Sequence, residues 1–69
     1  MSVAENVLRL RRAKGLTQLE LSERVGVARS MIAQIERGTR VPTILLGRDI
    51  ANVLGCSIEA LISDPEKED

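Results

Sequence analysis

Apolar residues recur along this chain at the three- and four-residue spacings of amphipathic helices, and glycines separate these stretches. The pattern predicts five helices and no strands, which is an all-α fold. The predicted helices begin near residues 2, 17, 28, 43 and 57. The fifth is a short helix through residue 62. The first four helices end at Gly15, Gly26, Gly38 and Gly55.

Two short helices joined by a tight turn are predicted by the segment TQLELSERVGVARSMIAQIERG. Thr17 and Glu20 have the S/T-x-x-E spacing of a capping box, in which each side chain binds a backbone N–H group at the helix start. Leu21 and Val25 then lie on one face of the first helix. Gly26 follows where the turn requires a positive φ, which glycine adopts without strain.

The second helix of this unit has one apolar face and several polar ones. Ile32 and Ile35, three residues apart, are expected to point toward the core. The other faces carry Arg29, Ser30, Ala33, Gln34 and Arg37. A helix that is anchored on one side and carries hydrogen-bonding groups on the other suits the major groove of DNA, so the unit is predicted to be a helix-turn-helix.

The remaining helices have caps and apolar faces of the same kind. Ser2 and Glu5 have capping-box spacing, and Thr43 and Ser57 are expected to cap the fourth and fifth helices. The buried side of the fourth helix is expected to consist of Ile44, Ile50, Ala51 and Leu54. Together the helices form one domain over residues 1–63, followed by an acidic tail at residues 64–69.

The composition restricts the kind of partner. Sixty-nine residues make one small domain, in which about 60% of the unfolded surface becomes buried. Hydrophobic residues make up 43% of the chain and aromatic residues are absent, so aliphatic side chains must fill the core. Proteins that bind single-stranded nucleic acid stack bases on aromatic rings. The composition therefore disfavours single-strand binding.

The formal net charge is zero, but the charge is unevenly distributed. Residues 1–40 contain eight basic and four acidic side chains, a net charge of +4, whereas residues 41–69 contain two and six, a net charge of −4. The basic excess includes the start of the second helix of the unit and the loop after it, as contacts with phosphates require. Arginine is also common on solvated helix faces, so both explanations stay open here.

The sequence contains no sign of an enzyme, a metal site or a cofactor. Histidine is absent, there is no Cys/His cluster, and no nucleophile has a base at a suitable spacing. The single cysteine, Cys56, excludes an intrachain disulfide and is expected to be a buried hydrophobe. No apolar run is long enough to span a membrane or to act as a signal peptide. We expect a cytoplasmic protein with no membrane partner and no small-molecule substrate.

Short motifs at fixed spacing resemble the Cro/C1-type (XRE) helix-turn-helix family, which has the lambda-repressor-like fold. The matching blocks, over roughly residues 5–62, are LRLRRAKGLTQLELSERVGV, ARSMIAQIERG, a proline and IANVLGCSIEALI. A single IxxIE or VG pair would mean little, but their combination is specific. The resemblance implies a five-helix bundle whose second and third helices form the helix-turn-helix.

The resemblance also implies which side chains contact DNA. In this family the third helix lies in the major groove and the second crosses the backbone. Arginine suits guanine, glutamine suits adenine, and the methyl group of Ala28 suits a thymine methyl. The implied base contacts are Ala28, Arg29, Ser30 and Gln34. The implied phosphate contacts are Gln18, Arg37, Thr39, Arg40 and Thr43.

Other positions are assigned to the scaffold. Arg11 and Glu36 match a family ion pair between the first helix and the end of the third. Ala28 replaces the usual Ser or Thr cap of the third helix, and Ser22 replaces an alanine and is expected to bond the preceding turn. Gly47 replaces an apolar residue inside the fourth helix, where a close backbone contact is expected.

We expect the protein to act as a homodimer that binds a double-stranded operator with two half-sites, because two linked domains bind more tightly than one. By resemblance, the dimer interface comprises Ile58, Leu61 and Ile62. Leu45 and Leu46, like Leu19, fall where the family is polar and are expected to be exposed, so they are further candidates. An alternative function is a protein-interaction module of the same fold, either an antitoxin or a polymerase- or coactivator-binding protein, which the neutral charge and surplus leucines favour.

Overall fold

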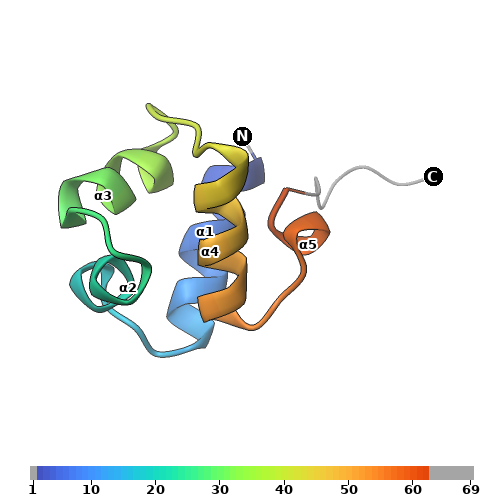
Figure 1. Ribbon diagram of the computed structural model, residues 1–69, viewed down its shortest axis with the longest axis horizontal. Coiled ribbons are helices and arrows are strands. Elements are labelled where there is room, and N and C mark those ends of the chain that lie inside the picture. Colours follow the sequence, from blue (N-terminus) through green and yellow to red (C-terminus); the bar gives the residue numbers. More distant parts are fainter. Residues whose placement is uncertain (1, 63–69) are drawn as a thin grey trace.

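The computed structural model describes residues 2–62, and this part of the chain contains five helices and no strands (Figure 1). The predicted tail at residues 64–69 lies outside the described residues. The helices are α1 (Ser2–Ala13), α2 (Gln18–Val25), α3 (Arg29–Arg37), α4 (Ile44–Leu54) and α5 (Ile58–Ile62). The prediction of an all-α fold is confirmed. None of these helices combines the length and the apolar character that crossing a membrane requires.

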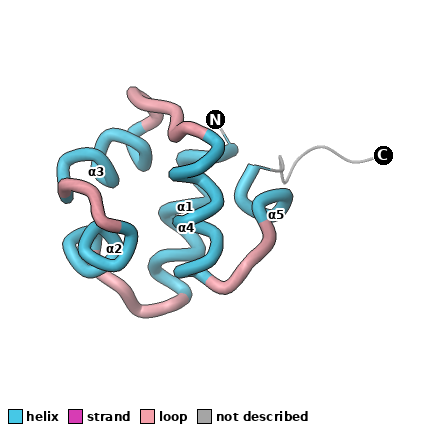
Figure 2. The backbone as a smooth tube through the Cα atoms, in the orientation of Figure 1, coloured by secondary structure: helices cyan, strands magenta, loops and turns pink. Residues whose placement is uncertain are grey.

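Helices α1 and α4 occupy the middle of the molecule, with α2 and α3 on one side and α5 on the other (Figure 1). α1 contacts α3 and α5, and α4 contacts α2 and α5, so the central pair holds both sides together. The loop between α3 and α4 runs along the outside of the bundle (Figure 2).

Local hydrogen bonds explain where the helices begin. The Thr17 hydroxyl accepts from the Glu20 N–H at 3.0 Å, and the Glu20 carboxylate accepts from the Thr17 N–H at 2.8 Å, so the predicted capping box is confirmed. Thr43 and Ser57 also cap α4 and α5 as predicted, through backbone N–H contacts of 3.2 and 3.1 Å. The side chain of Ser2 is outside the described part, so its capping box stays a prediction.

Aliphatic side chains from all five helices form one core. Burying one such side chain fully stabilises a protein by roughly 1.5–3 kcal/mol, so this cluster fixes α2 and α3 against the central helices. Its most deeply buried members are Val7, Leu21, Ile32, Ile35, Ile50 and Leu61.

The predicted buried side of α4 is wrong at its first residue. Ile44 is 80% exposed, whereas Ile50, Ala51 and Leu54 are buried as predicted. The buried stripe continues toward the helix start only as far as Gly47. Because glycine has no side chain to extend the core, the core ends before it reaches Ile44, one turn earlier.

Three further expectations about the scaffold have different outcomes. The Ser22 hydroxyl donates to the carbonyl of Leu19 at 2.7 Å, as predicted. The close backbone contact expected at Gly47 is wrong, because among the described residues outside α4 a Cβ atom there would meet only a side-chain atom, the Cδ1 of Ile58, at an ordinary 3.5 Å. Cys56 packs against the core but is only half-buried.

Asn6 is a buried polar residue that the apolar pattern did not reveal. Its amide nitrogen donates to the carbonyl of Leu61 at 2.8 Å, and its amide oxygen accepts from the Arg9 guanidinium at 3.0 Å. A buried amide is costly unless hydrogen bonds replace those it made with water. The contact with Leu61 therefore offsets this cost and ties α1 to α5.

Candidate nucleic-acid interface

The turn between α2 and α3 sets the angle at which α3 is presented. Gly26 adopts φ 90°, and its N–H donates to the Ser22 carbonyl at 2.8 Å. Leu21 on α2 and both Ile32 and Ile35 on α3 are buried in the common core. The inner face of α3 is therefore anchored, and its outer face points away from the domain.

The side chains predicted to read bases lie mostly on the outer side of α3. Ala28, Arg29 and Ser30 are exposed, and Gln34 is half-buried. Ala28 precedes the helix and makes no side-chain capping bond, as its methyl group dictates. The start of α3 therefore has no cap from the Ala28 side chain and lies beside an exposed arginine, and the helix dipole and the arginine charge both favour a negatively charged ligand.

The predicted structural ion pair joins Arg11 on α1 to Glu36 near the end of α3. Two parallel hydrogen bonds of 2.6 and 3.0 Å connect the guanidinium to the carboxylate, and both side chains are at most 10% exposed. A third guanidinium N–H donates to the carbonyl of Leu16 at 2.8 Å. The pair thus fixes α3, α1 and the loop before α2 relative to one another.

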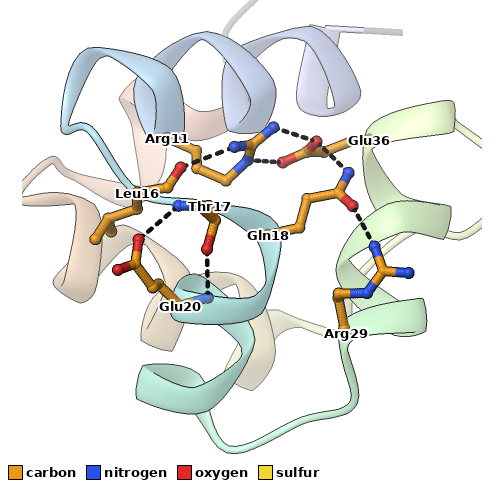
Figure 3. A network of polar contacts seen from close by, with 7 residues as sticks. All are labelled: Arg11, Leu16, Thr17, Gln18, Glu20, Arg29 and Glu36. Atoms are coloured by element: carbon orange, nitrogen blue, oxygen red, sulfur yellow. Dashed lines mark hydrogen bonds and ion pairs between the residues drawn. The ribbon is translucent and has the colours of Figure 1, made fainter.

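Gln18, the first residue of α2, extends this pair toward the surface (Figure 3). Its amide nitrogen donates to Glu36 Oε1 at 2.9 Å, and its amide oxygen accepts from Arg29 Nη1 at 3.0 Å. Four side chains from three helices form one continuous polar network. The sequence did not predict the contacts of Gln18, because Arg29 is eleven positions away and no spacing rule links the two.

A second pair lies at the other end of α3. The Arg40 guanidinium donates to the amide oxygen of Gln34 at 2.9 Å. The Thr39 hydroxyl donates to the Gln34 backbone carbonyl at 3.2 Å, which occupies the only proton of that hydroxyl. The Thr43 hydroxyl accepts from the backbone of α4, so its own proton is still available for an acceptor. Arg37 is exposed, as are Thr39, Arg40 and Thr43.

The family model described as Helix-turn-helix matches residues 7–61, most of the chain. The chain belongs to the Cro/C1-type helix-turn-helix family. It is therefore a DNA-binding domain of the kind found in transcriptional regulators.

Relatives of this helix-turn-helix domain include a bacterial and a phage protein. An uncharacterized HTH-type transcriptional regulator, y4dJ of Sinorhizobium fredii, is 38% identical over 65 residues, which cover 94% of this chain and 84% of the relative. The immunity repressor protein of Bacillus phage phi105 is 30% identical over 64 residues, which cover 93% of this chain and 44% of the repressor.

Solved structures of the family superpose closely on this domain. A structure of the SinR protein/SinI protein complex matches with a TM-score of 0.87 at 29% identity, covering 93% of this chain and 63% of that one. An HTH_3 family transcriptional regulator from Vibrio cholerae matches with a TM-score of 0.83 at 33% identity, covering 93% and 36%. The chain thus spans less than two thirds of the length of both.

Most of the large exposed apolar residues of the described chain lie near the start of α4 or the end of α5: Val41, Ile44, Leu45 and Ile62. Leu19, on α2, is 50% exposed, as expected. A groove of about 340 Å³ lies between the start of α4 and the end of α5. We call it the α4–α5 groove. Its apolar lining includes Val3, Val41, Pro42, Ile44, Ile58 and Ile62.

The residues predicted for a dimer interface differ in exposure. Leu45 and Ile62 are exposed, and Ile58 and Leu46 are half-buried, with Leu46 packed against the core. Leu61 is 0% exposed. Its burial contradicts a place on the surface, because its side chain is part of the core that joins α5 to α1. The expected exposure of Leu46 is likewise only partial.

Proposed function

We propose that this protein is a homodimeric regulator that binds double-stranded DNA sequence-specifically, at an operator with two half-sites. It acts by occupying the operator and thereby blocking or recruiting polymerase. The observation that carries the proposal is the outer side of α3, where Arg29 and Gln34 are each held by a polar neighbour while Ile32 and Ile35 anchor the inner side. Such a helix presents directional hydrogen-bonding groups on a rigid support.

The contacts divide into two classes. Arg29 donates to guanine, Gln34 bonds adenine, Ser30 bonds either base, and Ala28 meets a thymine methyl. The phosphate contacts are those that position the helix without reading sequence, and they are made by Gln18, Arg37, Thr39, Arg40 and Thr43. Both the hydroxyl and the backbone N–H of Thr39 donate to the Gln34 carbonyl, so a phosphate contact by Thr39 requires one of these bonds to be exchanged on binding.

A homodimer supplies the affinity that one domain lacks. Each domain has a few base contacts, whereas two domains on half-sites about 34–36 Å apart bind as one unit through their effective concentration. Exposed Leu45 and Ile62, with the half-buried Ile58 and Leu46, supply apolar area for the contact between copies. Leu61 supports this surface from beneath.

Selection from genomic DNA fragments with the purified protein, read by sequencing, tests the proposal. We expect a two-fold related site whose half-sites are one helical turn apart, and an affinity that falls steeply with salt. An Ile62→Ser variant is expected to need a higher protein concentration for half-saturation, with the same half-site sequence. Enrichment of single half-sites, or no enrichment at low salt, would contradict the dimeric regulator.

The α4–α5 groove favours a second candidate, a protein-interaction module of the same fold that acts as an antitoxin or binds polymerase or a coactivator. Contiguous exposed apolar residues mark surfaces that bind other proteins. One of the similar structures is a complex of SinR with another protein, SinI. This candidate predicts that DNA is not retained even at low salt, whereas the regulator predicts strong retention under those conditions.

A further inference from the structure

Arg40, in the loop after α3, donates through Nε to the side-chain oxygen of Gln34 at 2.9 Å. Gln34 is a predicted base reader, so this bond acts on a side chain that is expected to meet a base. We propose that Arg40 is a positioning residue for Gln34, so that Arg40 determines on which DNA strand Gln34 recognises adenine. The inference rests on the proposed function, because it concerns how the same surface reads DNA.

The bond from Arg40 fixes the direction of the Gln34 amide. The side-chain oxygen faces Arg40 Nε, so the NH2 group is the end of the amide that lies away from this contact. Turning the amide over would bring its NH2 group against the guanidinium. That contact would be repulsive, because both groups only donate hydrogen bonds. The bond thus sets the order of acceptor and donor that Gln34 presents.

The loop that carries Arg40 is attached to α3 at the same glutamine. The Thr39 N–H and the Thr39 hydroxyl both donate to the Gln34 backbone carbonyl, at 3.0 and 3.2 Å. Two consecutive loop residues therefore bind the backbone and the side chain of Gln34. Because Thr39 fixes the backbone beside Arg40, the arginine side chain starts from a defined position, which reduces the entropy lost when it binds the half-buried Gln34.

The order of acceptor and donor matters because it differs between the two orientations of an A·T pair. In the major groove adenine presents its N7 acceptor beside its N6 donor, and reversing the pair reverses that order. Gln34 matches adenine when its oxygen accepts from N6 and its NH2 group donates to N7. The oxygen has two lone pairs, so it can accept from Arg40 and from adenine together. A held amide therefore fits one orientation of the pair, whereas a freely turning amide fits both.

This role is compatible with the phosphate contact proposed for Arg40. The bond to Gln34 uses Nε, and the guanidinium has further N–H groups on its two Nη atoms that can face a phosphate. The two roles affect binding differently. A phosphate contact strengthens binding to every sequence, whereas positioning of Gln34 changes the ratio between two sequences.

The test is a selection from a library with randomised half-sites, using the full chain. The base pair read by Gln34 is the one at which Gln34→Ala abolishes the preference. Arg40→Met removes every donor of the side chain and keeps much of its apolar length. We expect it to lower the ratio of A·T to T·A at that pair about fivefold, the effect of losing one net hydrogen bond, with the other pairs unchanged. The ratio is taken within one variant, so a smaller folded fraction does not alter it.

Two comparisons separate positioning from the phosphate contact. Arg37 is exposed on the same helix and is not a side-chain partner of Gln34 within residues 2–62. The matched control Arg37→Met is therefore expected to weaken all sequences by one factor and to leave every preference intact. In a Gln34→Ala background, Arg40→Met is expected to do the same, because the residue that Arg40 positions is gone.

The outcomes distinguish this inference from the proposed function. If Arg40→Met alone behaves like Arg37→Met, the positioning role is overturned while the proposed function stands. The same conclusion follows if the wild-type protein selects a base pair other than A·T or T·A at the pair read by Gln34. A wild-type protein without any base preference would overturn both.

Discussion

The two sides of this domain differ in how their exposed groups are held. On the α2–α3 side, Arg29 and Gln34 each form a hydrogen bond with a neighbouring side chain, and one of these bonds continues into a buried ion pair. On the α4–α5 side, Ile44 and Ile62 project around an apolar groove. Hydrogen bonds impose direction, whereas apolar contact depends mainly on area. The α2–α3 surface is thus suited to distinguish between base sequences, and the α4–α5 surface is suited to bind another apolar surface.

Breaking the Arg11–Glu36 ion pair is expected to have the largest effect on stability, because the α2–α3 side and the α4–α5 side share one core. Glu36→Ala leaves the Arg11 guanidinium buried without its carboxylate, which costs about 3–5 kcal/mol of unfolding free energy. Urea unfolding followed by far-UV circular dichroism measures this loss. The double variant Arg11→Met/Glu36→Leu is expected to recover much of it, and a single-variant loss below about 1 kcal/mol would contradict a stabilising pair.

The next largest effect on stability is expected to differ between two neighbouring residues of α5. Leu61 is fully buried and Ile62 is 53% exposed. Leu61→Ala is expected to lower the unfolding free energy by about 2–5 kcal/mol, through lost burial and a cavity, and Ile62→Ala by roughly 0.5 kcal/mol or less. Thermal unfolding of both variants provides the comparison. Similar losses would show that α5 packs differently from the arrangement described.

On the polar side, Arg29→Ala is expected to relax discrimination at one base pair of each half-site by about 1–3 kcal/mol. Arg37→Ala, a change of the same kind on the same helix, is expected to weaken all sequences evenly and to reduce the slope of log affinity against log salt. Titrations with operator variants at several salt concentrations measure both. If the two variants give the same profile, the division into base and phosphate contacts is incorrect.

The smallest expected effect on stability comes from Gly47, which lines the α4–α5 groove. Gly47→Ala is expected to stabilise the domain by about 1 kcal/mol, because alanine favours the helix and its Cβ would meet Ile58 at 3.5 Å. Gly55→Ala is the control with the opposite sign, since Gly55 adopts φ +74° and any side chain there is strained. Chemical unfolding distinguishes a gain from a loss. A loss at Gly47 would mean that the groove is tighter than described.

Local signals in the sequence were sufficient to predict the positions of the helices. The capping box of Thr17 and Glu20 and the apolar spacing of Ile32 and Ile35 depend on residues within one or two turns, and the structure confirms both. The Arg11–Glu36 pair was implied only by the family resemblance, because it joins residues 25 positions apart.

The remaining features depend on where elements meet in space. Periodicity places Ile44 on the inner face of α4, but it cannot show that the core ends one turn after it. Likewise, the contacts of Gln18 and the bond from Asn6 to Leu61 depend on how the helices pack, so composition and spacing do not reveal them. The sequence therefore predicted which side chains lie on the outer side of α3, but it did not predict the hydrogen bonds that hold them.

The hydrogen bond from Asn6 to the Leu61 carbonyl spans 55 positions of the chain, and this separation affects how the domain folds during synthesis. Ribosomes add about 5–20 residues per second, so roughly 3–11 s pass between the addition of the two partners. Through that interval the Asn6 amide nitrogen lacks the Leu61 carbonyl as its acceptor, and α1 meets α5 only after α5 leaves the ribosome. Packing of α1 against α5 is thus the last step in assembling this domain, and a nascent chain stalled before Leu61 would expose apolar surface to chaperones.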